Sequence, residues 1–341
     1  MFMKKFKIYL ICVTFLSLII PKSLFAQVQQ GHTNQNKFRQ LYVEFADPNN
    51  YRNASGAPGV DYYQQKVDYV MDIELDDKNS KIYGEEEITY TNNSPDNLTY
   101  LWLQLDQNIR KKDSPSLDIN SSGNSVTQGP SSFLKNYISE PFDGGFNIEW
   151  VLDSQGNQLK YTINQTMMRV DLPVSLSPNG IFKFKIKWWY NINNRLEYGG
   201  RSGYEYFEGD GNKVYTIAQF FPRLCVYNDV EGWQNYQFWG NGEFALEFGD
   251  YQVNITVPSD HIMEATGTLQ NPKEVLTKEE YKRFITSKSS FEKPIIIVNQ
   301  DEAKLKESTF SKKKSTWQFN AKNVRDFGFA TSRKFIWDMM V

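Results

Sequence analysis

Two histidines, His32 and His261, are the only imidazoles in this 341-residue chain, and they lie 229 positions apart. A helical His-x-x-x-His pair, which is typical of zinc hydrolases, therefore cannot be written anywhere in the sequence. A Ser-His-Asp or Cys-His site would have to use one of these two residues, and an isolated histidine more often fills a surface or core position. The chain also lacks a G-x-x-x-x-G-K-[ST] phosphate-binding loop. These observations exclude the commonest histidine-based and phosphate-loop chemistries for the chain by itself.

Three acidic residues, Glu205, Glu208 and Asp210, gather in the segment YEYFEGDG. Two carboxylates a few ångströms apart could act as a glycosidase pair. The same oxygens could also bind calcium. Adjacent acids in a Gly-rich loop are more often solvated, because charged side chains prefer water unless they are paired. The sequence favours this solvated interpretation.

The most unusual stretch, residues 215–242, holds eight aromatic side chains and Cys225. Aromatic residues in such numbers usually pack in a core. Exposed Trp233 and Trp239 could instead stack on sugar rings. This leaves open an alternative function, a secreted β-sandwich module that binds glycans or proteins.

Alternation of apolar and polar residues with a period of two predicts that most of the chain is extended. The strands expected are 67–75, 82–90, 98–105, 146–152, 158–163, 168–172, 181–190, 214–217, 244–257, 294–298, 316–319 and 327–330. The first three are expected to form a meander. Pro173, Pro178 and Gly180 are placed in a turn, and 191–212 in a long loop. Thr277 and Glu280 fit a capping box, which predicts a helix from that point. The result is a mainly β, mostly antiparallel fold with one or two short helices.

The N-terminus predicts export. A basic start, an apolar run of thirteen residues from Ile8 to Ile20 and a small residue at Ala26 together indicate a signal peptide over residues 1–26. A polar leader, 27–60, follows. Cleavage would remove four lysines and no acids, which changes the net charge from −2 to −6 and gives no reason to expect nucleic acid as a partner. We therefore expect a periplasmic or extracellular protein without a membrane anchor, whose remaining Cys225 has no intrachain disulfide partner.

Four segments together resemble the N-terminal domain of the zinc aminopeptidases of the M1 (gluzincin) family, and more closely an exported bacterial branch of it. The first is YYQQKVDYVMDIELDDKNSKIYGEEEITYTNNSPDNLTYLWLQL, with the pattern I-x-G-x-x-x-I-x-Y-x-N of the family's opening hairpin. The second is the long run that begins IAQFFP at Ile217. Within that run, DYQVNITVP is similar to the strand that follows the substrate-contacting loop. WQFNAKNVRDFGFATS is similar to the segment that closes the domain.

The resemblance implies a large saddle-like antiparallel β-sandwich over 61–332, with 333–341 as the start of a missing catalytic domain. In the family, that thermolysin-like domain carries G-x-M-E-N, which holds the substrate amino group, and His-Glu-x-x-His, which binds zinc with a later Glu. Neither motif occurs in this sequence. The implied function is the N-terminal, substrate-pocket-forming part of an exported zinc metallo-aminopeptidase that removes N-terminal residues from peptides. By itself the chain would hold no metal and no catalytic residue, and its partners would be a peptide and the thermolysin-like domain.

The resemblance also implies two substrate-binding residues. The family's T-Q-x-E-P-like loop places a glutamine at the mouth of the active site, and the matching letters are those of residues 218–222, AQFFP. Gln219 is thus expected to contact the N-terminal residue of a peptide, since its amide offers both a donor and an acceptor. Phe220 is expected beside it. Ala218 stands where the family usually has Thr, and Phe221 where it usually has Glu, so the local hydrogen bonding differs from the family pattern.

Overall fold

The computed structural model describes residues 48–116, 142–240 and 245–341. The predicted signal peptide (1–26), His32 and most of the polar leader lie outside the described residues. The chain divides into two units, 1–62 and 63–341. In the first, residues 48–62 form a turn closed by an antiparallel bridge between Arg52 and Pro58. The Arg52 guanidinium lies over the Tyr62 ring.

The second unit is mainly β, as predicted. Its described residues form nineteen strands, four short α-helices and the 3-10 helix η2. The strands are β1 (Lys66–Asp76), β2 (Lys81–Thr91), β3 (Leu98–Gln104), β4 (Asn147–Asp153), β5 (Tyr161–Asn164), β6 (Met167–Leu176), β7 (Ile181–Asn191), β8 (Gly203–Phe207), β9 (Asn212–Ile217), β10 (Arg223–Leu224), β11 (Tyr227–Asn228), β12 (Gly232–Trp233), β13 (Gly249–Pro258), β14 (Ile262–Ala265), β15 (Thr268–Leu269), β16 (Ile295–Val298), β17 (Lys314–Val324), β18 (Phe329–Ser332) and β19 (Trp337–Met339). The helices are η2 (Asp106–Arg110), α6 (Arg195–Tyr198), α7 (Pro272–Val275), α8 (Lys278–Ser287) and α9 (Gln300–Glu307).

The largest sheet has seven strands in the order β15-β17-β13-β1-β2-β7-β4. Every second residue of β1 is buried, from Val67 to Leu75, and the residues between face away from the core. Strands β2 and β7 alternate in the same way. This is the half-buried pattern that the sequence predicts, because successive side chains of a strand point to opposite faces.

Strands β1 and β13 pair in parallel, with Tyr69 opposite Tyr251 and Glu74 opposite Thr256. The other pairs of this sheet are antiparallel. The parallel pair was not predicted from the sequence. It brings together strands that lie about half the chain apart.

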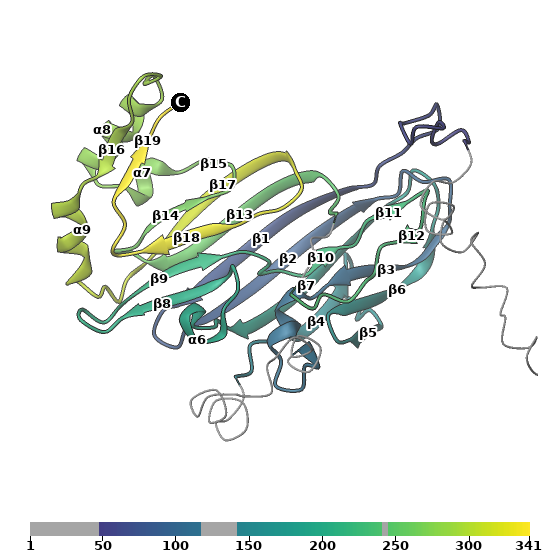
Figure 1. Ribbon diagram of the computed structural model, residues 1–341, viewed down its shortest axis with the longest axis horizontal. Coiled ribbons are helices and arrows are strands. Elements are labelled where there is room, and N and C mark those ends of the chain that lie inside the picture. Colours follow the sequence, from purple (N-terminus) through teal and green to yellow (C-terminus); the bar gives the residue numbers. More distant parts are fainter. Residues whose placement is uncertain (1–47, 117–141, 241–244) are drawn as a thin grey trace, which may run out of the picture. The chain divides into compact units, whose positions relative to one another are not determined.

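Two four-stranded sheets, β10-β3-β6-β5 and β14-β18-β9-β8, supply a second layer (Figure 1). The segment that joins them packs on the large sheet. Phe221 meets the Tyr69 ring edge-on at a centroid distance of 5.3 Å, and Phe220 lies 6.4 Å from Trp188. The predicted β-sandwich is therefore present, and its core lies between the layers.

The structure corrects three local predictions. The first three strands do not form a meander, because β3 pairs with β6 and β10 rather than with β2. Pro173 lies within β6, next to an irregularity in its pairing with β3, instead of in the following turn. A missing N–H is tolerated at such a site, where ladder hydrogen bonds are interrupted. The expected loop 191–212 contains α6 and β8.

Helix α8 begins as predicted, with both hydrogen bonds of the Thr277–Glu280 capping box formed. Helix α9 has a second capping box, built by Asn299 and Glu302. Residues 333–341 belong to the second unit, since β19 pairs with β16 and Trp337 packs against Phe284. The predicted start of another domain at residue 333 stays a prediction.

Candidate functional site

Gln219 lies just beyond β9, the strand that leads into the aromatic stretch. β9 pairs with β18 up to Ile217, opposite Phe329. The backbone then turns sharply, and Gln219 takes the left-handed conformation with φ 53°. Residues other than glycine adopt this conformation at a cost of about 1–2 kcal/mol, so the surrounding structure must hold it in place.

Gln107 of η2 supplies that support. It is buried, and its Nε2 donates to the carbonyl oxygen of Gln219 at 2.8 Å. Its Oε1 accepts from Arg110 Nη1 at 2.9 Å. On the preceding residue, the Ala218 N–H donates to Ser202 Oγ at 3.2 Å. The turn is thus held from both sides by polar side chains remote in sequence.

The other end of the loop is held by Arg223. This buried guanidinium donates to Asp106 Oδ2 at 2.8 Å and to Asp326 Oδ2 at 2.7 Å. Burial alone would disfavour its charge, but the two carboxylates outweigh burial and raise the pKa of Arg223 above its ordinary value. Because Asp106 and Gln107 are consecutive in η2, one short element fixes both ends of residues 218–223.

The Gln219 side chain itself is half-buried, and among the described residues its amide makes no side-chain hydrogen bond. A primary amide can donate two hydrogen bonds and accept others. Gln219 therefore presents an uncommitted donor and acceptor on a turn fixed by its backbone. This geometry suits recognition of a polar group such as a peptide amine or carbonyl.

Phe220, the second predicted substrate contact, is placed in the core. Its side chain is 0% exposed, and its ring meets Phe221 and Phe329 edge-on at centroid distances of 5.0 and 5.3 Å. In this arrangement the ring packs between the layers and presents no surface to a ligand. Contact between Phe220 and substrate stays a prediction that nothing in this position supports.

The acidic cluster of the β8–β9 hairpin is divided among basic partners. Glu205 Oε1 lies 3.5 Å from Arg195 Nη1, and the Asp210 carboxylate pairs with the Lys334 ammonium group. Glu208 is exposed. This distribution does not form the close carboxylate pair that a glycosidase requires.

Among the described residues, Cys225 is not suited to act as a nucleophile, and His261 is not suited to act as a general base. Cys225 is buried, and burial raises the pKa of its thiol far above the ordinary value, which keeps it protonated and inert. His261 is also buried, and burial lowers its pKa to about 4, so its ring is neutral. Its Nδ1 lies 3.2 Å from Thr331 Oγ1.

In the described ranges, no three His, Cys, Asp or Glu side chains lie close enough to hold a metal ion. The described donors therefore do not fit zinc, and we derive no zinc-dependent step from them. The expectation that the full enzyme holds zinc elsewhere stays a proposal. In the same ranges, no helix is both long and apolar enough to cross a membrane.

The two tryptophans singled out for sugar stacking are not freely exposed. Trp233 packs edge-on against Tyr227 at 5.1 Å and lies 6.1 Å from Tyr90. Trp239 is half-buried. The binding-module alternative thus gains no supporting feature from these side chains, and it stays untested.

Gln219 was singled out from the sequence, whereas Gln107, Asp106 and Arg223 were not. Their only sequence signal is polarity next to apolar strands. Burial of polar groups with satisfied hydrogen bonds becomes visible only once the chain is folded.

Comparison with known proteins was made on sequence and on structure. No family model matches the chain, and no curated protein matches it. Among solved structures, the chain is similar to a crystal structure of an M1 zinc metallopeptidase from Deinococcus radiodurans, with a TM-score of 0.41 and 12% identity over 80% of this chain and 43% of that one. It is also similar to a mutant of that enzyme bound to a Tyr-Ser-Ala substrate, with a TM-score of 0.40 and 11% identity over 79% and 42% of the two chains. The chain spans less than half the length of each of these structures.

Proposed function

We propose that this chain is the substrate-pocket-forming N-terminal part of an exported zinc metallo-aminopeptidase. In this proposal, zinc and its ligands belong to a thermolysin-like domain outside the sequence, and the chain supplies one wall of the peptide site. The sequence resemblance is the starting point for the proposal. A metal held by the other domain would supply the hydrolytic chemistry, and the residues of the present chain would contribute binding of the peptide.

The single observation that carries the proposal is the presentation of Gln219. Its backbone is held in a left-handed turn by Gln107, and its amide is uncommitted among the described side chains. Such backbone strain gathers at ligand-contacting positions, where the surrounding structure outweighs it. An amide at this point can accept from a peptide's terminal ammonium and donate to its carbonyl.

Exposed apolar side chains also support the proposal of a second domain. Apolar side chains are exposed around the β16–β19 ribbon, namely Ile296, Ile336 and Met340. Exposed apolar side chains grouped around one ribbon can mark an interaction surface. They support the proposal that this ribbon contacts the thermolysin-like domain.

The first test is the reading frame downstream of Val341. We expect it to encode G-x-M-E-N and His-Glu-x-x-His. We also expect N-terminal sequencing of the exported protein to begin at Gln27. A stop codon at this point, with neither motif nearby, would contradict the proposal.

The second test uses that full-length enzyme with Gln219→Ala. We expect kcat/KM for peptide substrates to fall about tenfold, the effect of losing roughly 1.4 kcal/mol of transition-state binding, while zinc content stays the same. Gln165→Ala is a matched control, because Gln165 also has a left-handed backbone and its carbonyl also accepts from η2, through Asn108 at 2.7 Å. Equal kinetics for the wild type and Gln219→Ala would remove Gln219 from the site.

A further inference from the structure

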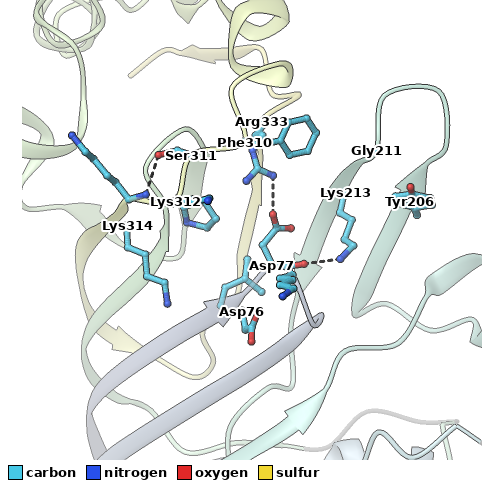
Figure 2. Close-up of a pocket in the computed structure, with 14 residues that line it drawn as sticks. Asp76, Asp77, Tyr206, Gly211, Lys213, Phe310, Ser311, Lys312, Lys314 and Arg333 are labelled. Atoms are coloured by element: carbon cyan, nitrogen blue, oxygen red, sulfur yellow. Dashed lines mark hydrogen bonds and ion pairs between the residues drawn. The ribbon is translucent and has the colours of Figure 1, made fainter.

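A pocket of about 520 Å³ opens in the second unit, beside the first residues of β9. Gln219 lies beyond the other end of that strand. Three segments meet there. They are the β1–β2 turn with Asp77, the β8–β9 hairpin with Tyr206 and Lys213, and residues 310–314 that lead into β17. Figure 2 shows Asp77 between Lys213 on one side and Lys312 and Lys314 on the other, with Arg333 above it. The volume falls in the range of small-molecule sites.

The floor of the pocket is a buried ionic network. Arg333 is only 3% exposed; its Nη1 donates to Asp77 Oδ2 at 2.8 Å and its Nε donates to Asp260 Oδ2 at 2.9 Å. Tyr215 Oη donates to the other Asp77 oxygen at 2.8 Å. Because both carboxylates are engaged, they offer little to an entering cation, and the floor is fixed in shape.

The rim carries an excess of positive charge. Six cationic side chains line the pocket and only two acidic ones, Asp76 and Asp77. Three of the cations are committed: Arg333 to the floor, Lys213 to the Asp77 carbonyl at 2.6 Å, and Lys314 to Glu74.

The remaining three cations are Lys78, Lys312 and Lys313. All are exposed, and within the described residues none of their ammonium groups forms an ion pair or hydrogen bond. The whole chain is slightly acidic, with a net charge of −2, so this concentration of unpaired ammonium groups is local. A lysine acts as a mobile point charge with three donors, a form suited to phosphate, sulfate and carboxylate groups.

Two aromatic rings complete the rim. Phe310 and Tyr206 are 47% and 45% exposed. A Cβ built on Gly211 would lie 3.8 Å from Phe310 Cζ and 4.0 Å from Tyr206 Oη, so both side chains border this glycine. The Phe310 ring also rests on the Arg333 guanidinium, at 5.0 Å from the ring centroid. The rings therefore form an apolar edge next to the cations.

We propose that this pocket binds a small organic anion, a phosphate, sulfate or carboxylate carried on a planar ring. The anionic group lies among Lys78, Lys312 and Lys313, and the ring packs between Phe310 and Tyr206. This site is separate from the Gln219 turn, and it does not depend on the proposed peptidase function.

The test is calorimetric titration of the purified protein with phenyl phosphate, phenyl sulfate, benzoate and inorganic phosphate. We expect saturable binding of at least one aryl anion with a dissociation constant of about 1 mM or lower, and weaker binding of inorganic phosphate. Affinity should fall in ~1 M salt, where the screening length is about 3 Å. The ranking of the three aryl probes identifies the anionic group.

The variants separate charge from ring. In Lys312→Ala/Lys313→Ala we expect about tenfold weaker binding of the best aryl probe, through loss of two charge contacts. Lys304→Ala/Lys322→Ala removes the same charge from exposed positions outside the pocket and should bind like the wild type. Tyr206→Ala should weaken the aryl probe but not inorganic phosphate.

Three results would overturn the assignment. One is an absence of saturable binding for all four probes up to ~10 mM, well above the expected dissociation constant. Another is equal loss of binding in the two lysine double variants. The third is binding of inorganic phosphate as tight as that of every aryl anion, which would remove the ring contact. Circular dichroism confirms that each variant is folded, so that none of these results reflects misfolding.

Discussion

Gln219 holds a backbone conformation that a glycine would adopt without strain. The fold compensates with two hydrogen bonds: Gln107 donates to the Gln219 carbonyl oxygen, and Ser202 Oγ accepts from the N–H of the neighbouring Ala218. A position at which the chain bears strain to keep a particular side chain is a candidate for function rather than for stability. The residue is thus informative because of its backbone as much as its amide.

The strain can be measured at this residue. We expect Gln219→Gly to unfold with a free energy about 1 kcal/mol higher than Gln219→Ala, because only the alanine keeps the left-handed penalty. The same pair of substitutions at Gln252, exposed in β13, should give the opposite order, since glycine weakens a strand. Urea unfolding monitored by tryptophan fluorescence provides the comparison. An alanine variant as stable as the glycine variant would mean that the turn is unstrained.

At the same scale, the sequence offered Gln219 as a candidate binding residue but gave no sign of the side chains that support it. Gln219 could be singled out from the letters around it. Gln107 lies 112 positions away and no local pattern links the two. The basic pocket was missed for the same reason: residues 312–314 have the composition of a solvated hairpin tip. Their pocket forms only because Asp77 and Arg333, which are 256 positions apart, meet beneath them.

Strand β13 is the element on which the large sheet depends. It pairs in parallel with β1 on one side and antiparallel with β17 on the other. Its first residue, Gly249, lies so close to β1 that a Cβ there would sit 1.7 Å from the Val67 carbonyl oxygen. The backbone approach, rather than a positive φ, is what requires glycine at this position.

A substitution at Gly249 should therefore disrupt an element rather than a side-chain contact. We expect Gly249→Ala to lower the free energy of unfolding by about 3 kcal/mol or more, because backbone atoms must move apart. Gly209→Ala is the matched control, since a Cβ on Gly209 meets nothing within 4 Å and should change stability by less than about 0.5 kcal/mol. Chemical denaturation of both variants tests this. A Gly249→Ala protein as stable as Gly209→Ala would show that β1 and β13 separate easily.

Strands were predictable from the sequence where one face of the strand meets the core and the other meets solvent. Alternation located β1, β2 and β7 closely, and the capping box located α8. Pairing was less accessible, since alternation does not specify which strand lies beside which. The transfer of β3 to the second layer and the parallel β1–β13 pair both involve partners chosen by long-range packing. Helix α9 has little apolar periodicity, and its capping box became evident only in the structure.

Across the whole molecule, some buried acids make the free energy of unfolding fall as the pH rises, and others make it fall as the pH drops. Glu86 is fully buried and has no hydrogen-bond partner among the described residues, and burial raises the pKa of its carboxyl well above the ordinary value. Burial raises the pKa of Glu247 to about 7. In Asp77 and Asp260, burial acts in the same direction, but hydrogen bonds, including those from Arg333, outweigh it and lower the pKa.

These shifts predict maximal stability on the acidic side of neutrality. A glutamate ionises in the unfolded chain near pH 4.3, so the stability contributed by Glu86 and Glu247 is complete below ~4.3 and is lost as pH rises, for Glu247 through about 7. The two aspartates contribute stability above ~3.9 that is lost as the pH falls further. Buried His261 acts against this trend, because its pKa of about 4 means that stability is lost as the pH falls below ~6.5. With two raised glutamates against one lowered histidine, we expect a higher free energy of unfolding at pH ~5 than at pH ~8.

The assignment can be checked with paired substitutions. Glu86→Gln/Glu247→Gln should flatten the decline between pH ~5 and ~8, whatever its effect on absolute stability, because neither amide titrates. Glu208→Gln/Glu292→Gln removes two exposed carboxyls and should keep the wild-type slope. Urea unfolding over this pH range gives the slopes. The same slope in both double variants would contradict the role of the buried acids.

The parallel contact between β1 and β13 also bears on how the chain reaches this structure. Tyr69 and its partner Tyr251 are separated by 182 positions, so during synthesis from the N-terminus the centre of the sheet cannot close until β13 has been made. Until β13 emerges, β1 is an unpaired edge with a row of open backbone donors and acceptors, a known template for aggregation. Contacts this distant in sequence slow folding. A chain with this topology gains from remaining unfolded, or bound by a holding chaperone, until most of it is available.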